Sequence, residues 1–109
     1  MIVGEDTHAV LKILGTQVRL ARGTKKWTAE QAAVRAGVSA RTVTAIERGT
    51  PQVAVGKVFE VALAVGVDLL GTGNRDNLEM LAASYDQAAS LLPVRVRAPQ
   101  PAREVFRDF

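Results

Sequence analysis

The chain has 109 residues, a net charge of +3, 48% hydrophobic residues, 5% aromatic residues and no cysteine. This length suits one small domain with some chain left over, and the lack of cysteine excludes disulfides and thiolate metal sites. No apolar run approaches the ~20 residues that span a bilayer, and the start MIVGEDTH has no signal-peptide pattern, so we expect a cytoplasmic protein without membrane contact.

Charge is distributed unevenly along the chain. Residues 1–50 hold eight Lys/Arg and four Asp/Glu, a balance of +4, whereas residues 51–109 hold six and seven, a balance of −1. Phosphate binding requires positive charge on the surface that meets the nucleic acid. The first half of the chain is therefore the expected location of any DNA-binding surface.

The first predicted helix is capped by Asp6 or Thr7 and ends near Arg22 or Gly23. Apolar residues recur along it at spacings of four, four and three, which defines one helix face. These residues are Val10, Leu14, Val18 and Ala21. His8, the single histidine, is expected at the solvated start of this helix.

A basic connector follows over residues 23–26. Lys25 and Lys26 lie next to the start of the following helix, whose backbone N–H groups attract anions. Phosphate contacts by these lysines and a solvated loop are equal alternatives. Trp27 is expected to fill the gap between helices as a core anchor rather than to stack on a base.

Residues 28–36 are predicted to form a short helix. Thr28 is the expected N-cap, and Gln31 three residues later completes a capping box. Gly37 supplies the left-handed residue that ends the helix. One helix face is small enough for another helix to approach closely, because it consists of Ala32, Ala33 and Ala36.

A second short helix is predicted from Ser39 to Gly49. Ser39 caps it, and Val43 and Ile46, with Val38 just before, give it a buried stripe. Two helices joined by a glycine-containing turn, with polar residues outward on the second, form a helix-turn-helix pattern. In this motif the second helix enters the DNA major groove.

The segment resembles the helix-turn-helix domain of the lambda-repressor and Cro superfamily. That domain has a Trp-Thr entry, an Ala-Gly-Val-Ser turn and an Ile-Glu-Arg-Gly exit. The chain has Trp27-Thr28 at the entry, residues 36–39 as the turn and residues 46–49 at the exit. The resemblance covers roughly residues 10–70.

The resemblance also implies a structural ion pair. In this superfamily an arginine late in the first helix commonly pairs with a glutamate near the end of the recognition helix, and Arg22 and Glu47 stand at these positions. Such a pair would fix the angle of the recognition helix rather than add net stability. The alternative is two independent surface charges.

The helix that starts at Ser39 is expected to contact DNA. Arg41 can donate two hydrogen bonds to guanine, and Thr44 can reach a base edge or a thymine methyl. Ala40 and Ala45 offer only apolar contact. Arg48, at the helix end, is expected to bind phosphate, which positions the protein without specifying sequence.

One familiar phosphate contact is missing. At Ala29, where relatives often carry a glutamine, the chain departs from the family pattern, and Lys25, Lys26 or Thr28 is expected to substitute. The alternative is that all these side chains simply face solvent. The predicted DNA-contacting set is Lys25, Lys26, Thr28, Ser39, Ala40, Arg41, Thr44, Ala45 and Arg48.

Residues 54–65 are predicted as a fourth helix, with valines and alanine at three- and four-residue spacing. These are Val55, Val58, Val61, Ala62 and Val65. Valine is a poor helix former, so packing must hold this helix. The stretch from residue 49 to residue 67 also resembles that of HipB-like proteins, the DNA-binding antitoxins of HipA-like kinases.

After a linker at residues 71–74, a fifth helix is predicted over residues 77–92. Its apolar stripe either forms a dimer surface or folds back on its own domain, and the sequence favours neither. Residues 94–97 alternate apolar and basic, which predicts a short strand that would pair with a partner chain. Phe106 and Phe109 lie in a tail that is expected either to dock on a partner protein or to have no role. The tail also resembles those of HipB-like proteins.

The predicted fold is therefore all-α: a five-helix lambda-repressor-like domain with a C-terminal tail. The expected divisions are a DNA-binding domain over residues 1–72, a dimerisation helix over residues 73–92 and a tail over residues 93–109. No carboxylate pair, nucleophile, metal cluster or phosphate loop is evident, so we expect neither catalysis nor a cofactor.

The expected function is repression of transcription by a homodimer on a palindromic operator. Through the resemblance, the leading role is an autoregulating antitoxin that binds a HipA-like kinase toxin. The alternatives are a phage or stress repressor without such a partner and a protein-interaction module that uses the fold without DNA.

Overall fold

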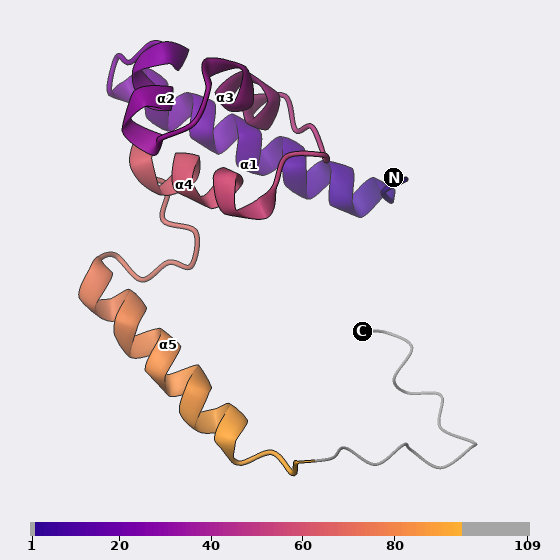
Figure 1. Cartoon of the computed structure of the whole chain (residues 1–109), viewed down its shortest axis with the longest axis vertical. Helices are drawn as coiled ribbons and strands as arrows, with labels where there is room; N and C mark the ends of the chain where they lie inside the picture. Colours follow the sequence, from indigo (N-terminus) through magenta and orange to yellow (C-terminus); the bar gives the residue numbers. More distant parts are fainter. Residues whose placement is uncertain (1, 95–109) are drawn as a thin grey trace. The chain divides into compact units, whose positions relative to one another are not determined.

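The computed structural model describes residues 2–94. Within them the fold is all-α, as predicted, and it contains five helices and no strand (Figure 1). The helices are α1 (Glu5–Thr24), α2 (Ala29–Ala36), α3 (Ala40–Glu47), α4 (Val55–Val65) and α5 (Arg75–Ser90). The chain divides into two compact units, residues 1–71 and residues 72–109. No helix in the described part is long and apolar enough to cross a membrane.

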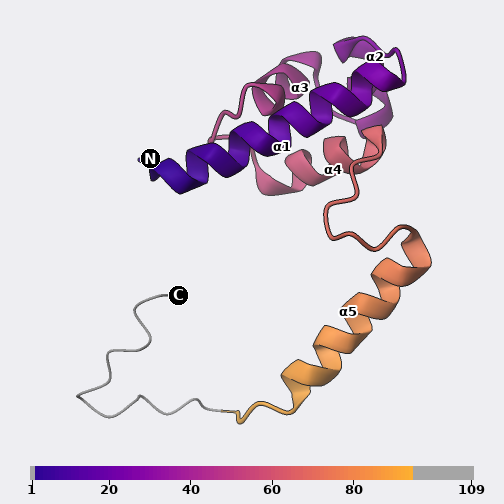
Figure 2. The same cartoon turned by 180° about the vertical axis from the view of Figure 1, so that it is seen from behind.

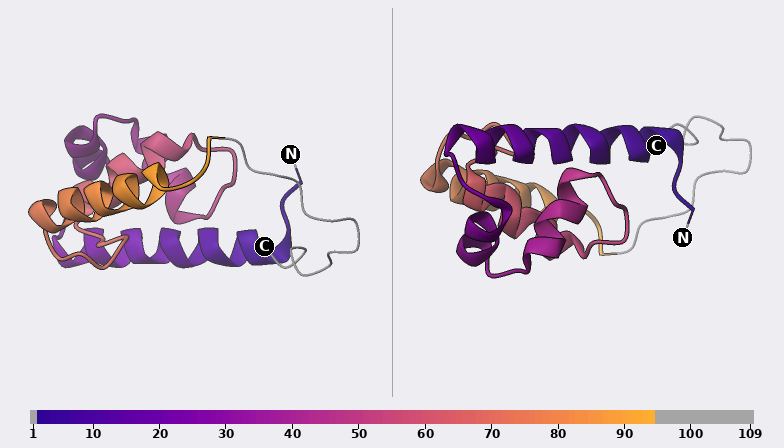
Figure 3. Two further views of the ribbon diagram at one scale, coloured as in Figure 1. Left: turned by 90° about the horizontal axis from the view of Figure 1, so that it is seen from below. Right: turned by 90° about the horizontal axis from the view of Figure 1, so that it is seen from above.

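The first unit is built on α1. Helices α2, α3 and α4 all lie on one side of α1, and α2 packs on both α3 and α4 (Figures 2 and 3). Their facing side chains form a core of small aliphatic residues, and within residues 2–94 no polar or charged residue is buried. The core consists of Val18, Ala32, Ala33, Val43, Ile46, Val58, Val61, Ala62 and Val65.

Two glycines let α1 and the end of α3 come into backbone contact. A Cβ at Gly15 would clash with the carbonyl oxygens of Ile46 and Glu47, the latter at 2.8 Å. Gly49, with φ of 78°, ends α3 in the left-handed conformation, and a Cβ there would lie 3.2 Å from the backbone nitrogen of Lys12. Close backbone contact between α1 and the end of α3 therefore helps to fix the position of α3.

The predicted start of α1 is wrong. The helix begins at Glu5 with Gly4 as its N-cap, and neither Asp6 nor Thr7 caps it. Acidic side chains inside the first turn complement the helix dipole, so Asp6 is favourable there without a capping role. Val10, on the same predicted helix face as Leu14 and Val18, is 62% exposed. Figure 1 shows that the N-terminal turns of α1 extend past the other helices of this unit.

The valine stripe of α4 is buried except at its start. Val58, Val61 and Val65 are in the core, whereas Val55, the first residue of the helix, is 66% exposed. Gly66 ends α4 with φ of 93°.

Helix α5 begins two residues earlier than predicted, because Asn74 acts as its N-cap. The Asn74 side chain accepts a hydrogen bond from the Asn77 backbone N–H at 2.8 Å. None of the residues of α5 is buried. The strand predicted over residues 94–97 falls, apart from Val94, outside the described residues.

Candidate nucleic-acid interface

Two capped helices and one tight turn form the core of the predicted site. The Thr28 hydroxyl accepts from the Gln31 backbone N–H at 3.1 Å, and the Gln31 side chain accepts from the Thr28 N–H at 2.8 Å. Gly37 takes the left-handed conformation with φ of 72°. The Ser39 hydroxyl then accepts from the Thr42 N–H at 3.1 Å. This is the capping box, turn and second cap that the sequence predicts.

Arg22 joins three parts of the first unit. Its Nε and Nη2 donate to Glu47 at 2.7 and 2.9 Å, and its Nη1 donates to the Trp27 carbonyl at 2.8 Å. The side chains of Arg22 and Glu47 are only 20% and 10% exposed. The hydrogen bond to Glu47 raises the pKa of Arg22 above its already high ordinary value, so the guanidinium stays charged. The end of α1, the entry to α2 and the end of α3 are thereby held together.

The outer face of α3 carries two exposed cations. Arg41, in the first turn, and Arg48, at the C-cap, are both exposed, and neither pairs with a carboxylate within residues 2–94. Ala40, Thr44 and Ala45 are half-buried, and Ala40 packs against the core. The surface that α3 offers to a ligand is therefore dominated by its two arginines.

The position of Arg41 works against the stability of α3. The first turn of a helix carries a partial positive charge, which favours acidic residues, and α3 has none there. A cation at this end costs about 0.3–1 kcal/mol when nothing compensates it. A negatively charged ligand at this surface would supply the missing compensation.

The residues before α2 are exposed but partly engaged. Lys25 holds its Nζ 5.2 Å from the centre of the Trp27 ring, and the Thr28 hydroxyl is used in the cap. Lys26 has φ of 60°, a left-handed conformation that is uncommon outside glycine. This conformation ends α1, and the Lys26 N–H donates to the Gly23 carbonyl at 2.9 Å. Ala29, the departure from the family pattern, packs partly against the core.

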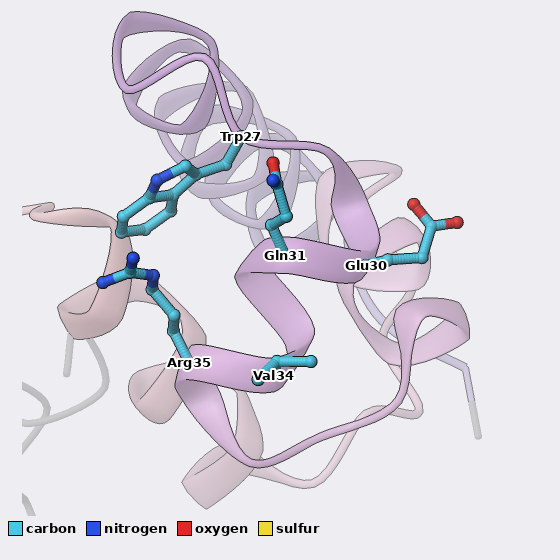
Figure 4. A pocket seen from close by; sticks show the side chains of 5 residues that line it. All are labelled: Trp27, Glu30, Gln31, Val34 and Arg35. Carbon is cyan, nitrogen blue, oxygen red and sulfur yellow. The ribbon is translucent and has the colours of Figure 1, made fainter.

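A shallow pocket on α2 was not anticipated from the sequence. It has a volume of about 330 Å³ and is lined by Trp27, Glu30, Gln31, Val34 and Arg35 (Figure 4). The guanidinium of Arg35 lies 4.4 Å from the centre of the Trp27 ring, as a cation–π contact. Spacing could have indicated this, because residues 27, 31 and 35 recur every four positions. Trp27 is half-buried against the core, in line with the anchor role rather than a free stacking surface.

The resemblance to known proteins agrees with this geometry. The model of the helix-turn-helix domain family matches residues 13–79, more than half of the chain. No curated protein and no solved structure shows significant similarity to the chain. In this motif the second helix binds in the DNA major groove, and α3 is that helix here. The chain therefore belongs to the helix-turn-helix domain family and has the architecture of a DNA-binding regulator.

Proposed function

We propose that this protein is a sequence-specific transcriptional repressor that inserts α3 into the major groove of its operator. The observation that carries the proposal is the pair of exposed, unpaired arginines on α3. Arg41, in the first turn of α3, is the proposed reader of sequence, because a guanidinium can donate two hydrogen bonds to guanine O6 and N7. Arg48, at the C-cap of the same helix, is proposed to bind phosphate, which fixes the register.

The repressor acts as a homodimer on a palindromic site, with two recognition helices in successive major grooves. Bound there, it blocks RNA polymerase. The biological role proposed is that of a HipB-like antitoxin that represses its own operon and binds a HipA-like kinase. This part is supported by the resemblance of residues 49–67 and of the C-terminal tail to HipB-like proteins.

Selection of bound sites from random duplex DNA tests the proposal. We expect an enriched palindrome whose half-sites are about one helical turn apart. Failure to enrich any sequence at low salt would contradict a sequence-specific function and favour a protein-interaction module. Copurification with a kinase encoded by the adjacent gene would support the antitoxin role.

Substitutions distinguish the proposed roles of Arg41 and Arg48. Arg41→Ala should relax preference at one base position, with a loss of about 1–3 kcal/mol of discrimination. Arg48→Ala should weaken binding to all sequences alike and reduce the salt slope by about 1. Binding titrations at several salt concentrations measure both effects, and equal behaviour of the two variants would contradict the assigned roles.

A further inference from the structure

The outer face of α1 carries a second apolar stripe that the core of the first unit does not use. Val10, Ile13 and Leu20 are 62%, 60% and 66% exposed, and the exposed Gln17 lies between them. Gly15 is two residues from both Ile13 and Gln17, so it points the opposite way, towards α3. Figure 2 shows that α1 runs along the outside of the first unit.

The spacing of this stripe is that of a seam between two helices. Its positions recur strictly at three and four residues from Val10 to Leu20, and Asp6 and Thr24 continue the series at each end. A strict seven-residue repeat is typical of helix pairs, whereas a globular core takes a wider face. Gln17 is a polar residue within the stripe, and a single polar residue in such a seam can set its register. Ala9 and Thr16, which flank one side of the stripe, are small enough for a second helix to approach closely.

We propose that this stripe, Val10–Ile13–Gln17–Leu20, is the surface on which a second copy of the chain docks through its own α1, with the two helices antiparallel. The proposal deepens the dimeric repressor and rests on that function only for its biological meaning. In this register Val10 faces Leu20 of the second copy, and Ile13 faces its Gln17. The two Gln17 amides then flank the symmetry axis, separated by roughly 6 Å along the helices.

Charge selects the antiparallel direction. α1 begins with Glu5 and Asp6 and is followed directly by Lys25 and Lys26, all of them exposed. In the antiparallel pair the acidic start of each helix meets the basic end of the other, because Asp6 of one copy lies level with Thr24 of the other, next to Lys25. A parallel pair would place like charges together at both ends, which is destabilising.

The pairing is also compatible with operator geometry. Because α3 packs on α1 at Gly15, opposite the stripe, the order across the dimer is α3, α1, α1 and α3. Three helix-to-helix steps of about 8–10 Å place the recognition helices roughly 24–30 Å apart. This separation approaches the ~34–36 Å between successive major grooves.

The mass of the full chain in solution, without DNA, tests the surface. We expect twice the chain mass of 11.6 kDa for the unaltered protein and the single mass for Ile13→Glu. Val34→Glu is the matched control, because Val34 is 81% exposed on α2 and lies off the stripe. It should stay dimeric, and circular dichroism should show unchanged helix content in both variants. A monomeric unaltered chain, or a dimeric Ile13→Glu, would overturn the proposal.

Cross-linking tests the direction, and the chain has no native cysteine to interfere. A short bis-maleimide should join two copies of Thr16→Cys, because residue 16 lies beside the symmetry axis. It should not join two copies of Ala9→Cys, which would be about 18 Å apart along the helices. Equal cross-linking at both positions would mean a parallel pair. A single mass for every variant, with a lower melting temperature for Ile13→Glu, would mean that another part of the same chain covers the stripe. DNA binding enters neither measurement, so failure here leaves the repressor proposal to its own test.

Discussion

Helices α2 and α3 have the same length, yet their charges are arranged in opposite ways. Both have eight residues, a hydroxyl N-cap and two buried apolar side chains. In α2, Glu30 lies in the first turn and Arg35 in the last, so each charge complements the helix dipole. In α3 the first turn carries Arg41, and no acidic residue lies there.

The comparison shows that α2 follows the helix-dipole rule and that α3 departs from it. Arg35 of α2 is also engaged within the chain, because its guanidinium lies over the Trp27 ring. The cations of α3 have no carboxylate partner among the described residues. Local rules are commonly broken at functional sites, and α3 breaks one where α2 obeys it.

The largest expected effect on stability comes from the backbone contact between Gly15 of α1 and the end of α3. Gly15→Ala should lower the free energy of unfolding by about 3 kcal/mol, because its Cβ would meet the carbonyl oxygens of Ile46 and Glu47. Gly23→Ala is the control, since nothing lies within 4 Å of a Cβ there. It should stabilise the chain by roughly 0.5–1 kcal/mol. Urea unfolding measures both, and amide shifts should change more at the end of α3 than in α2.

Next in size is the loss of the ion pair that holds the end of α3. Glu47→Ala should cost about 2–3 kcal/mol, because it leaves the guanidinium of Arg22 half-buried without its carboxylate. Glu30→Ala, an exposed acid on α2, should cost only a few tenths of a kcal/mol, roughly the size of a dipole contact. Similar losses in the two variants would show that the pair contributes nothing beyond general charge balance.

The N-caps of α2 and α3 should contribute equally to the free energy of unfolding. Thr28→Ala and Ser39→Ala each remove the hydrogen bond from the backbone N–H of the third residue of a helix, so each should cost about 1 kcal/mol in thermal or urea unfolding. Ser39→Ala also removes the exposed contact between the Ser39 and Thr42 hydroxyls. A clearly larger loss for Thr28→Ala would show that the reciprocal bond from Gln31 strengthens the cap of α2. In that case the two helices would differ in anchoring as well as in charge.

The smallest effect on stability is the sharpest test of the comparison, because its sign differs between the helices. Arg41→Gln should stabilise the free protein by about 0.3–1 kcal/mol and weaken DNA binding. Arg35→Gln should destabilise it by a similar amount and leave DNA binding unchanged. Melting curves and binding titrations on the same samples would check both, and a shared sign would remove the distinction.

Sequence reasoning located the helix-turn-helix because its signals are local. A hydroxyl cap, a left-handed glycine and an apolar spacing within eight residues each act through neighbours along the chain. Thr28, Gly37 and Ser39 therefore lie where they were expected. The Arg22 and Glu47 contact came instead from the family resemblance, because no local pattern links residues 25 positions apart.

Periodicity does not show which residues of a helix face the tertiary packing covers. Val10 and Val55 fit the periodicity of their helices but lie beyond the packed region, so they are exposed. The Trp27 and Arg35 contact crosses from a connector to a helix. The predicted strand falls largely outside the described residues and stays a prediction. The DNA-contacting set remains a prediction, with Arg41 and Arg48 as its most accessible members on α3.

The chain contains one tryptophan and one tyrosine, and they lie in different units. Trp27 sits at the entry to α2 under the guanidinium of Arg35, whereas Tyr85 lies on α5 and is 69% exposed. Indole emission excited at the red edge, where phenol does not absorb, therefore reports only the α1–α4 unit. The native protein thus carries an intrinsic optical probe with which melting of the α1–α4 unit can be followed without labels.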